Sequence, residues 1–129
     1  MIEINNKTIK NWSVVGPRPT LGVILFEIAK SLDNLMVVTA DVSTSAGLDR
    51  YRKTYPEKFV DTGISEQNMI DVAIGLALEG KKVFCYAMAP FISLRAVEQI
   101  KQIGIMNLPI CLISVGVGIG YADSGPTHY

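Results

Sequence analysis

The chain of 129 residues lacks an excess of charge of either sign, because 12 lysines and arginines balance 12 aspartates and glutamates. A neutral chain without a basic cluster does not favour nucleic acid or an anionic membrane as a partner. No apolar run is long enough to cross a bilayer, and the polar start MIEINNKTIK resembles neither a signal peptide nor a transit sequence. The sequence therefore predicts one domain that binds no nucleic acid and no membrane.

Cysteine and histidine are scarce. The two cysteines, Cys85 and Cys111, each lie in an apolar run typical of a strand, which predicts buried free thiols in a reducing cytoplasm. A disulfide between neighbouring strands is the alternative. His128 is the only histidine. The chain has no Cys/His cluster, no P-loop and no Ser-His-Asp order, so neither a metal site nor acyl transfer is predicted.

Apolar residues are abundant at 49% of the chain, which is at the upper end for a soluble domain. Such an excess indicates strands buried on both faces, an apolar surface covered by a partner, or both. The strand-like runs cover 35–40, 59–63, 82–87 and 108–115, and helical periodicity covers 20–33, 65–79 and 91–105. Because apolar strands alternate with helices, we expect an α/β fold, a three-layer sandwich with a mostly parallel sheet and helices on both faces.

The two ends of the chain have less regular patterns. Residues 1–17 are polar, and they end at the breaker cluster GPRP, so we expect an irregular N-terminal extension over 1–17 and one domain over 18–129. The other end contains GVGIGY, which does not match the dinucleotide-binding pattern G-x-G-x-x-G, and no helical pattern follows it. A dinucleotide-binding module is therefore only weakly indicated.

Polar residues follow the predicted strands at their carboxyl ends, where ligands of parallel sheets bind. We expect Asp41 and the segments 61–66, 87–91 and 116–128 to meet at this edge. Glu66 stands out because it begins a helix between two apolar stretches. The helix dipole alone would account for an acid there. However, Ser65 is already a suitable N-cap, and a carboxyl group in apolar surroundings can share a proton with a ligand nitrogen.

Four other residues near this edge have two interpretations each. Phe91 packs in the core or stacks on a flat heterocycle. His128 is exposed near the chain end, or the turn before it aims it into a cleft. Asp41 forms a turn or contacts a ligand, and Arg95 is a solvated helix residue or contacts a phosphate.

Four segments together resemble the pyrimidine-binding domain of thiamine diphosphate enzymes of the transketolase group. This group includes 1-deoxyxylulose-5-phosphate synthase and the beta subunits of 2-oxoacid dehydrogenases. The segments are TAD (39–41), DTGISEQNMIDVAIGLALEGKKVF (61–84), PFISLRAVEQIK (90–101) and DSGPTHY (123–129). The resemblance covers residues 18–129, and the GPTH block favours transketolase or the deoxyxylulose synthase over the dehydrogenases.

The resemblance implies that Glu66 and His128 are catalytic. Glu66 would hydrogen-bond a ring nitrogen of the cofactor's aminopyrimidine and favour its imino tautomer, whose nitrogen removes the proton from the thiazolium carbon. The resulting ylid attacks a ketose, and the cofactor accepts electrons while a carbon–carbon bond breaks. His128 would hydrogen-bond the sugar or the intermediate. Phe91 would stack on the pyrimidine, and Asp41 and Ile64 would lie near the cofactor.

The resemblance also implies a partner. The family's diphosphate half carries a Gly-Asp-Gly motif and an asparagine that hold magnesium, and the chain has no match to them. We therefore expect thiamine diphosphate to be shared with a diphosphate-binding subunit or domain that holds the magnesium, in a homo-dimer or hetero-tetramer. The family domain normally continues past GPTH, so we expect the domain over 18–129 to be incomplete at its C-terminus and inactive alone.

The expected reaction is transfer of a ketol unit between sugar phosphates, but two positions depart from the transketolase pattern. Ser124 stands where transketolases carry an aspartate that contacts the donor sugar, and Gly116 stands where they carry a second histidine. Two alternative functions therefore stay open. One is a non-catalytic paralogous or truncated domain that acts through dimerisation, and the other is a component similar to 1-deoxyxylulose-5-phosphate synthase.

Overall fold

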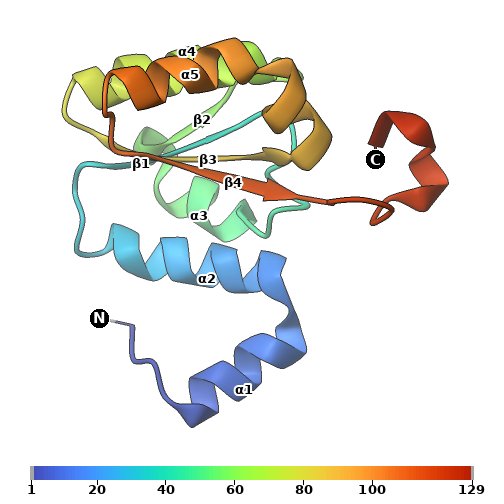
Figure 1. The fold of residues 1–129 in the computed structure, drawn as a ribbon. Coiled ribbons are helices and arrows are strands. Elements are labelled where there is room, and N and C mark those ends of the chain that lie inside the picture. Colours follow the sequence, from blue (N-terminus) through green and yellow to red (C-terminus); the bar gives the residue numbers. More distant parts are fainter. Residues whose placement is uncertain (1, 129) are drawn as a thin grey trace.

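The computed structural model describes residues 2–128, which form a four-stranded parallel sheet with helices on both faces (Figure 1). The strands are β1 (Leu35–Thr39), β2 (Phe59–Asp61), β3 (Lys82–Met88) and β4 (Ile110–Val115), in the spatial order β2-β1-β3-β4. The α-helices are α1 (Asn6–Val15), α2 (Pro17–Ala29), α3 (Asp49–Thr54), α4 (Glu66–Leu78) and α5 (Val97–Ile105). This arrangement confirms the predicted three-layer α/β fold.

Strand β1, one of the two central strands, separates two apolar cores, because successive side chains of a strand point to opposite faces of the sheet. Leu35 and Val37 pack on the side of α2 and α3. Met36 and Val38 pack on the side of α4 and α5. Figure 1 shows α4 and α5 above the sheet and α2 and α3 below it. Because both faces of β1 are buried, its residues form a continuous apolar run.

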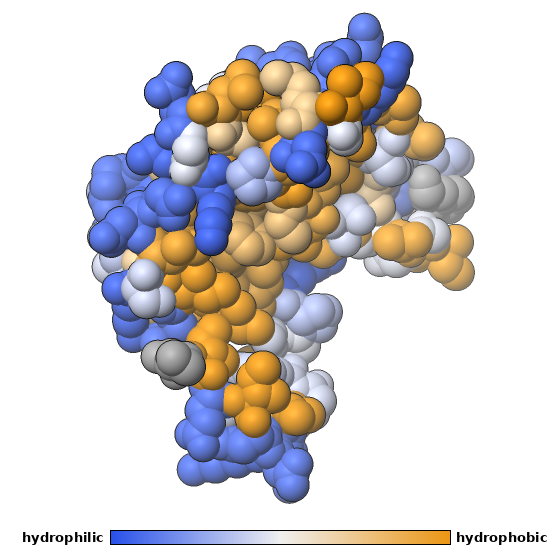
Figure 2. Space-filling view, turned by 60° about the vertical axis from the view of Figure 1, so that its left-hand side comes forward, coloured by the Kyte–Doolittle hydropathy of each residue, from blue (hydrophilic) through white to orange (hydrophobic). Residues whose placement is uncertain are grey.

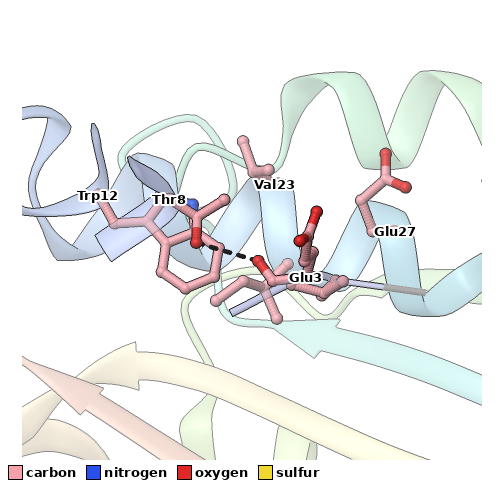
Figure 3. Close-up of a pocket in the computed structure, with 7 residues that line it drawn as sticks. Glu3, Thr8, Trp12, Val23 and Glu27 are labelled. Carbon is pink, nitrogen blue, oxygen red and sulfur yellow. Dashed lines mark hydrogen bonds between the residues drawn. The ribbon is translucent and has the colours of Figure 1, made fainter. Parts of the chain in front are cut away.

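The expectation that residues 1–17 are irregular is wrong, because residues 6–15 form helix α1. A capping box begins this helix. The side-chain oxygen of Asn5 accepts hydrogen bonds from the backbone N–H groups of Lys7 and Thr8, and the Thr8 hydroxyl accepts one from the N–H of Asn5. Between α1 and α2 lies a cavity of about 310 Å³, lined by Trp12 and Val23 among others (Figure 3).

The predicted helix over 91–105 is divided in two. Phe91–Arg95 form a single turn of π-helix, called η2 here, and α5 begins only after Ala96, whose φ of −108° and ψ of 21° are not helical. Such π-turns are uncommon and occur often at functional sites. The division makes Phe91 the first residue and Arg95 the last residue of the short turn η2.

The expectation that both cysteines are buried is correct only for Cys85. Cys111 is exposed, and both thiols are free. Strand β4 is at the edge of the sheet, so its side chains receive less cover than those of β3. None of the helices within residues 2–128 has the length and apolar character that crossing a membrane requires.

Apolar side chains also reach the surface. Figure 2 shows a broad apolar area across the middle of one face of the molecule. Among the large apolar side chains that are exposed are Ile64, Leu94 and Val97, which belong to the loop before α4, to η2 and to α5. The apolar excess of the composition is therefore divided between two buried cores and exposed surface.

Candidate functional site

A cavity of about 140 Å³ opens at the carboxyl ends of the two central strands, β1 and β3. It is lined by Ala40, Asp41, Val42, Ile64, Glu66, Met88 and Phe91. Residues that follow β1, begin α4 and begin η2 meet there because parallel strands end at the same edge of the sheet. The structure thus brings together Asp41, Ile64, Glu66 and Phe91, the four residues expected near a cofactor.

Glu66 is the first residue of α4 and is only 3% exposed. A carboxylate removed from water in this way requires a positively charged or hydrogen-bonding partner. Arg95 provides one, because its Nη1 atom donates a hydrogen bond to Oε2 of Glu66 at 2.6 Å. The Arg95 side chain is itself 44% exposed, so it covers the carboxylate from the solvent side.

Arg95 also packs on the aromatic wall of the cavity. Its guanidinium carbon lies 4.4 Å from the centroid of the Phe91 ring, a cation–π distance. Arg95 is partly solvated, as expected, but the sequence did not indicate that it pairs with Glu66, and the phosphate contact stays a prediction. The four-residue spacing from Phe91 to Arg95 predicts a shared helix face. The pairing with Glu66 joins distant parts of the chain and has no local sequence signal.

A second carboxylate, that of Asp61, organises the loop at the cavity without lining it. Oδ1 of Asp61 accepts hydrogen bonds from the backbone N–H groups of Asp41 at 2.8 Å and Gly63 at 3.0 Å, and Oδ2 accepts one from the Thr39 hydroxyl at 3.1 Å. The sequence predicted that Asp61 lies at this edge of the sheet but did not indicate its role. Its bond to Gly63, two residues ahead, is the local turn that aspartate commonly forms after a strand.

Ser65 occupies the N-cap position of α4 but does not cap the helix with its side chain. Its hydroxyl donates to the carbonyl oxygen of Thr62 at 2.8 Å instead. The expectation that Ser65 caps the helix is therefore wrong. Because Glu66 is the first residue of α4 and lines the cavity, the positive end of the helix dipole lies close to the cavity.

His128 lies beside the cavity and does not line it. Its ring meets the Phe91 ring edge to face, with centroids 5.1 Å apart, and its Nδ1 atom is 2.8 Å from the Thr127 hydroxyl. The chain end thus turns back toward the site. Gly116 and Ser124, the two departures from the transketolase pattern, also lie outside the cavity lining.

Comparisons with known proteins agree with this geometry. The family model for the transketolase pyrimidine binding domain matches residues 18–129. A putative transketolase C-terminal section from Methanocaldococcus jannaschii is 37% identical over 114 residues, which are 88% of this chain and 36% of that protein. A 1-deoxy-D-xylulose-5-phosphate synthase from Prochlorococcus marinus is 36% identical over 108 residues, or 83% of this chain and 16% of that protein.

A solved structure is also similar to this chain. It is described as a split gene transketolase, inactive beta4 tetramer, and it superposes with a TM-score of 0.68 at 34% identity. The match covers 75% of this chain and 32% of that one. The chain therefore spans about a third or less of the length of each of these relatives. With the family model matching all but its first 17 residues, the chain belongs to the transketolase pyrimidine-binding domain family.

Proposed function

We propose that the chain is the pyrimidine-binding part of a thiamine diphosphate-dependent enzyme that transfers a ketol unit between sugar phosphates. The observation that carries this proposal is the placement of Glu66, a buried acid in a cavity whose wall includes the Phe91 ring. The relatives named as transketolase and deoxyxylulose phosphate synthase support the same class of activity.

The residues that line the cavity fit an aminopyrimidine. A cavity of about 150 Å³ holds one benzene ring, and this one measures about 140 Å³. Phe91 offers an aromatic face for stacking, and Glu66 offers a carboxylate that accepts hydrogen bonds. Ile64 and Met88 add apolar side chains to the lining, and a hydrogen bond is electrostatically stronger in apolar surroundings than in water.

Each residue then has a defined task. Glu66 would bind a ring nitrogen and share a proton with it, while Phe91 would fix the plane of the ring. Asp41 would lie against the ring at the end of β1. His128, held next to Phe91, would hydrogen-bond the sugar. When bound, thiamine diphosphate supplies an electron sink for cleavage of a carbon–carbon bond.

The proposal includes a partner, a diphosphate-binding subunit or domain that holds magnesium, in a homo-dimer or hetero-tetramer. Two observations support a partner. Ile64 lines the cavity and is 77% exposed, and Leu94, on the same short turn η2 as the lining residue Phe91, is 73% exposed, so two elements that form the cavity carry exposed apolar side chains. The relative of known structure is described as a tetramer that is inactive, which supports our expectation that this chain is inactive alone.

Reconstitution tests the proposal. The chain, a diphosphate-binding partner, magnesium and thiamine diphosphate are combined, and ketol transfer between sugar phosphates is measured. We expect Glu66→Ala to abolish the activity while size-exclusion chromatography still shows the complex. Glu57→Ala, which changes an exposed acid on the short helix after α3, is the matched control. Activity that survives Glu66→Ala would overturn the proposed role of the acid.

A non-catalytic domain that acts through dimerisation is the second candidate. It is favoured by the region around Gly116, where the Tyr121 ring fills the space that a side chain at position 116 would need. A transketolase-like histidine at that position therefore does not fit this arrangement. Calorimetry separates the two candidates: an assembled complex with a stable interface that fails to bind thiamine diphosphate is the result that this second function predicts.

A further inference from the structure

The cavity of the candidate site is open while the ion pair between Glu66 and Arg95 is formed. Glu66 and Phe91 line this cavity, and Arg95 does not. Yet the guanidinium of Arg95 contacts both lining residues. Its Nη1 atom donates a hydrogen bond to Oε2 of Glu66 at 2.6 Å, and its carbon atom lies 4.4 Å from the centroid of the Phe91 ring. The arginine therefore supports two walls of the cavity from outside it.

We propose that Arg95 is a positioning residue, which holds the Glu66 carboxylate by Oε2 so that Oε1 is presented to a ring nitrogen of an aminopyrimidine. The inference rests on the proposed function, because it names the residue that orients the acid of that site. Arg95 itself would not touch the ligand. It acts on ligand binding only through Glu66.

The two carboxylate oxygens of Glu66 differ in their surroundings. Oε2 is bonded to Arg95, whereas no hydrogen bond to Oε1 is formed within residues 2–128. In that part of the chain the enclosed side-chain atoms without a hydrogen-bond partner are the Tyr86 hydroxyl and the Gln99 amide oxygen, so Oε1 is not enclosed. Since Glu66 lines the cavity, Oε1 is the oxygen that reaches it. A ring nitrogen that carries a proton requires such an acceptor.

The turn η2 explains how the arginine fixes this orientation. The last torsion of a glutamate side chain has a broad energy minimum, so the carboxylate plane needs a partner to hold it. Phe91 and Arg95 are the first and last residues of η2, and the guanidinium stacks on the ring. A guanidinium is planar and its N–H donors have fixed directions. Once it is stacked on Phe91, its hydrogen bond therefore also fixes the carboxylate of Glu66.

A purely structural role for the ion pair gives a different result. The Glu66 side chain is only 4% exposed, and breaking a buried pair leaves a charge without compensation, which lowers the free energy of unfolding. A pair that serves stability alone would leave the affinity of the folded chain for a ligand unchanged. A positioning residue, by contrast, changes that affinity, and it does so only while the Glu66 carboxylate is present.

The probe for the test is 4-amino-2,5-dimethylpyrimidine, which is uncharged in mildly alkaline buffer, so losing the charge of Arg95 does not itself attract or repel it. It is titrated into the full chain, and its dissociation constant is measured by NMR. We expect Arg95→Met to bind the probe about tenfold more weakly, the effect of losing a hydrogen bond to a charged group. Arg95→Lys, which keeps the charge without the flat fork, should bind with intermediate affinity. Lys101→Met, which removes an exposed charge from α5, is the matched control and should bind like the unchanged chain.

A double-mutant cycle tests whether the arginine acts through the acid. In a Glu66→Gln chain there is no carboxylate to orient, so adding Arg95→Met should change the dissociation constant by less than about twofold. The doubly changed chain also holds no uncompensated buried charge at this pair. If Arg95→Met alone does not fold, Arg95→Lys takes its place in the cycle.

The ¹⁵N resonance of the ring nitrogen in the bound probe gives a second readout. It should be displaced from its free position in the unchanged chain and lie closer to that position in Arg95→Met. Unchanged or stronger binding in the Arg95 variants, or an equal loss of affinity with and without the Glu66 carboxylate, overturns the positioning role. If Glu66→Gln nevertheless weakens binding, the proposed function stands. If the probe binds none of these proteins, both proposals are wrong.

Discussion

The carboxylate of Asp61 holds the backbone of Asp41 by a hydrogen bond of 2.8 Å, which ties the end of β2 to the end of β1 at the cavity. Asp41 has a φ of 58°, in the left-handed region that costs energy for residues other than glycine. One acid thus fixes the strained conformation of another that lines the candidate site. The same carboxylate also binds Thr39 and Gly63.

We expect Asp61→Ala to lower the free energy of unfolding by about 1 to 3 kcal/mol, because three hydrogen bonds are lost and the strain at Asp41 is no longer opposed. Denaturant unfolding measures the change. Asp71→Ala, which removes an exposed acid from α4, is the control and should stay within about 0.5 kcal/mol of the unchanged chain. Equal stability of the two variants would show that the Asp61 contacts contribute nothing.

Two helical glycines should respond in opposite directions to alanine. A Cβ atom at Gly22 on α2 would lie 2.1 Å from the carbonyl oxygen of Gly47, whereas one at Gly75 on α4 would meet no atom within 4 Å. We expect Gly22→Ala to destabilise the fold by about 1 to 3 kcal/mol through overpacking. Gly75→Ala should stabilise it by up to about 1 kcal/mol through helix propensity. Thermal unfolding of both variants decides the matter, and a stable Gly22→Ala protein would refute the close approach.

The two thiols should differ in reactivity. Cys85 is fully buried on β3, and Cys111 is exposed on the edge strand. Titration with a thiol reagent should modify one cysteine per native chain and two per chain in denaturant. Cys111→Ser should show no reaction in the native state. Rapid modification of both thiols under native conditions would mean that β3 is not covered as described.

Alkaline pH should destabilise the fold. Burial raises the pKa of the Cys85 thiol from its ordinary value of 9.0 to about 12, with a smaller effect of Cys111. The folded chain therefore keeps this proton where the unfolded chain releases it. The contribution of the buried Cys85 thiol to the free energy of unfolding is intact below pH 9 and is lost between pH 9 and pH 12. We expect the unfolding free energy to fall more steeply with pH in this window than it does for Cys85→Ala, by up to about 1.4 kcal/mol per pH unit. If the unfolding free energy of the two proteins depended equally on pH in this window, the raised pKa of Cys85 would be contradicted.

Much of the candidate site followed from the sequence, because apolar strands that alternate with helices place distant loops at one sheet edge. The family resemblance then selected Glu66 and Phe91. The ion pair between Glu66 and Arg95 could not be predicted from the sequence, because it depends on where the turn η2 ends. Exposure of Cys111 did not follow either, because an apolar run does not reveal that its strand is at the edge.

Helix α1 was missed for a different reason. Its residues are mostly polar and none of them is buried, so its composition does not indicate a helix that packs in the core. The signal that was present is the pair Asn5 and Thr8, three residues apart, which forms the capping box. Capping residues would therefore have been the better guide in this part of the chain.

The central claim is that the Glu66 carboxylate binds a ring nitrogen of the aminopyrimidine. The most direct test is the ¹⁵N NMR spectrum of labelled thiamine diphosphate, bound to the chain assembled with its diphosphate-binding partner. We predict that one ring nitrogen is shifted from its free-ligand position in the unchanged complex and returns to that position in Glu66→Gln, with the ligand still bound. Identical ring-nitrogen shifts in the two complexes would contradict the account.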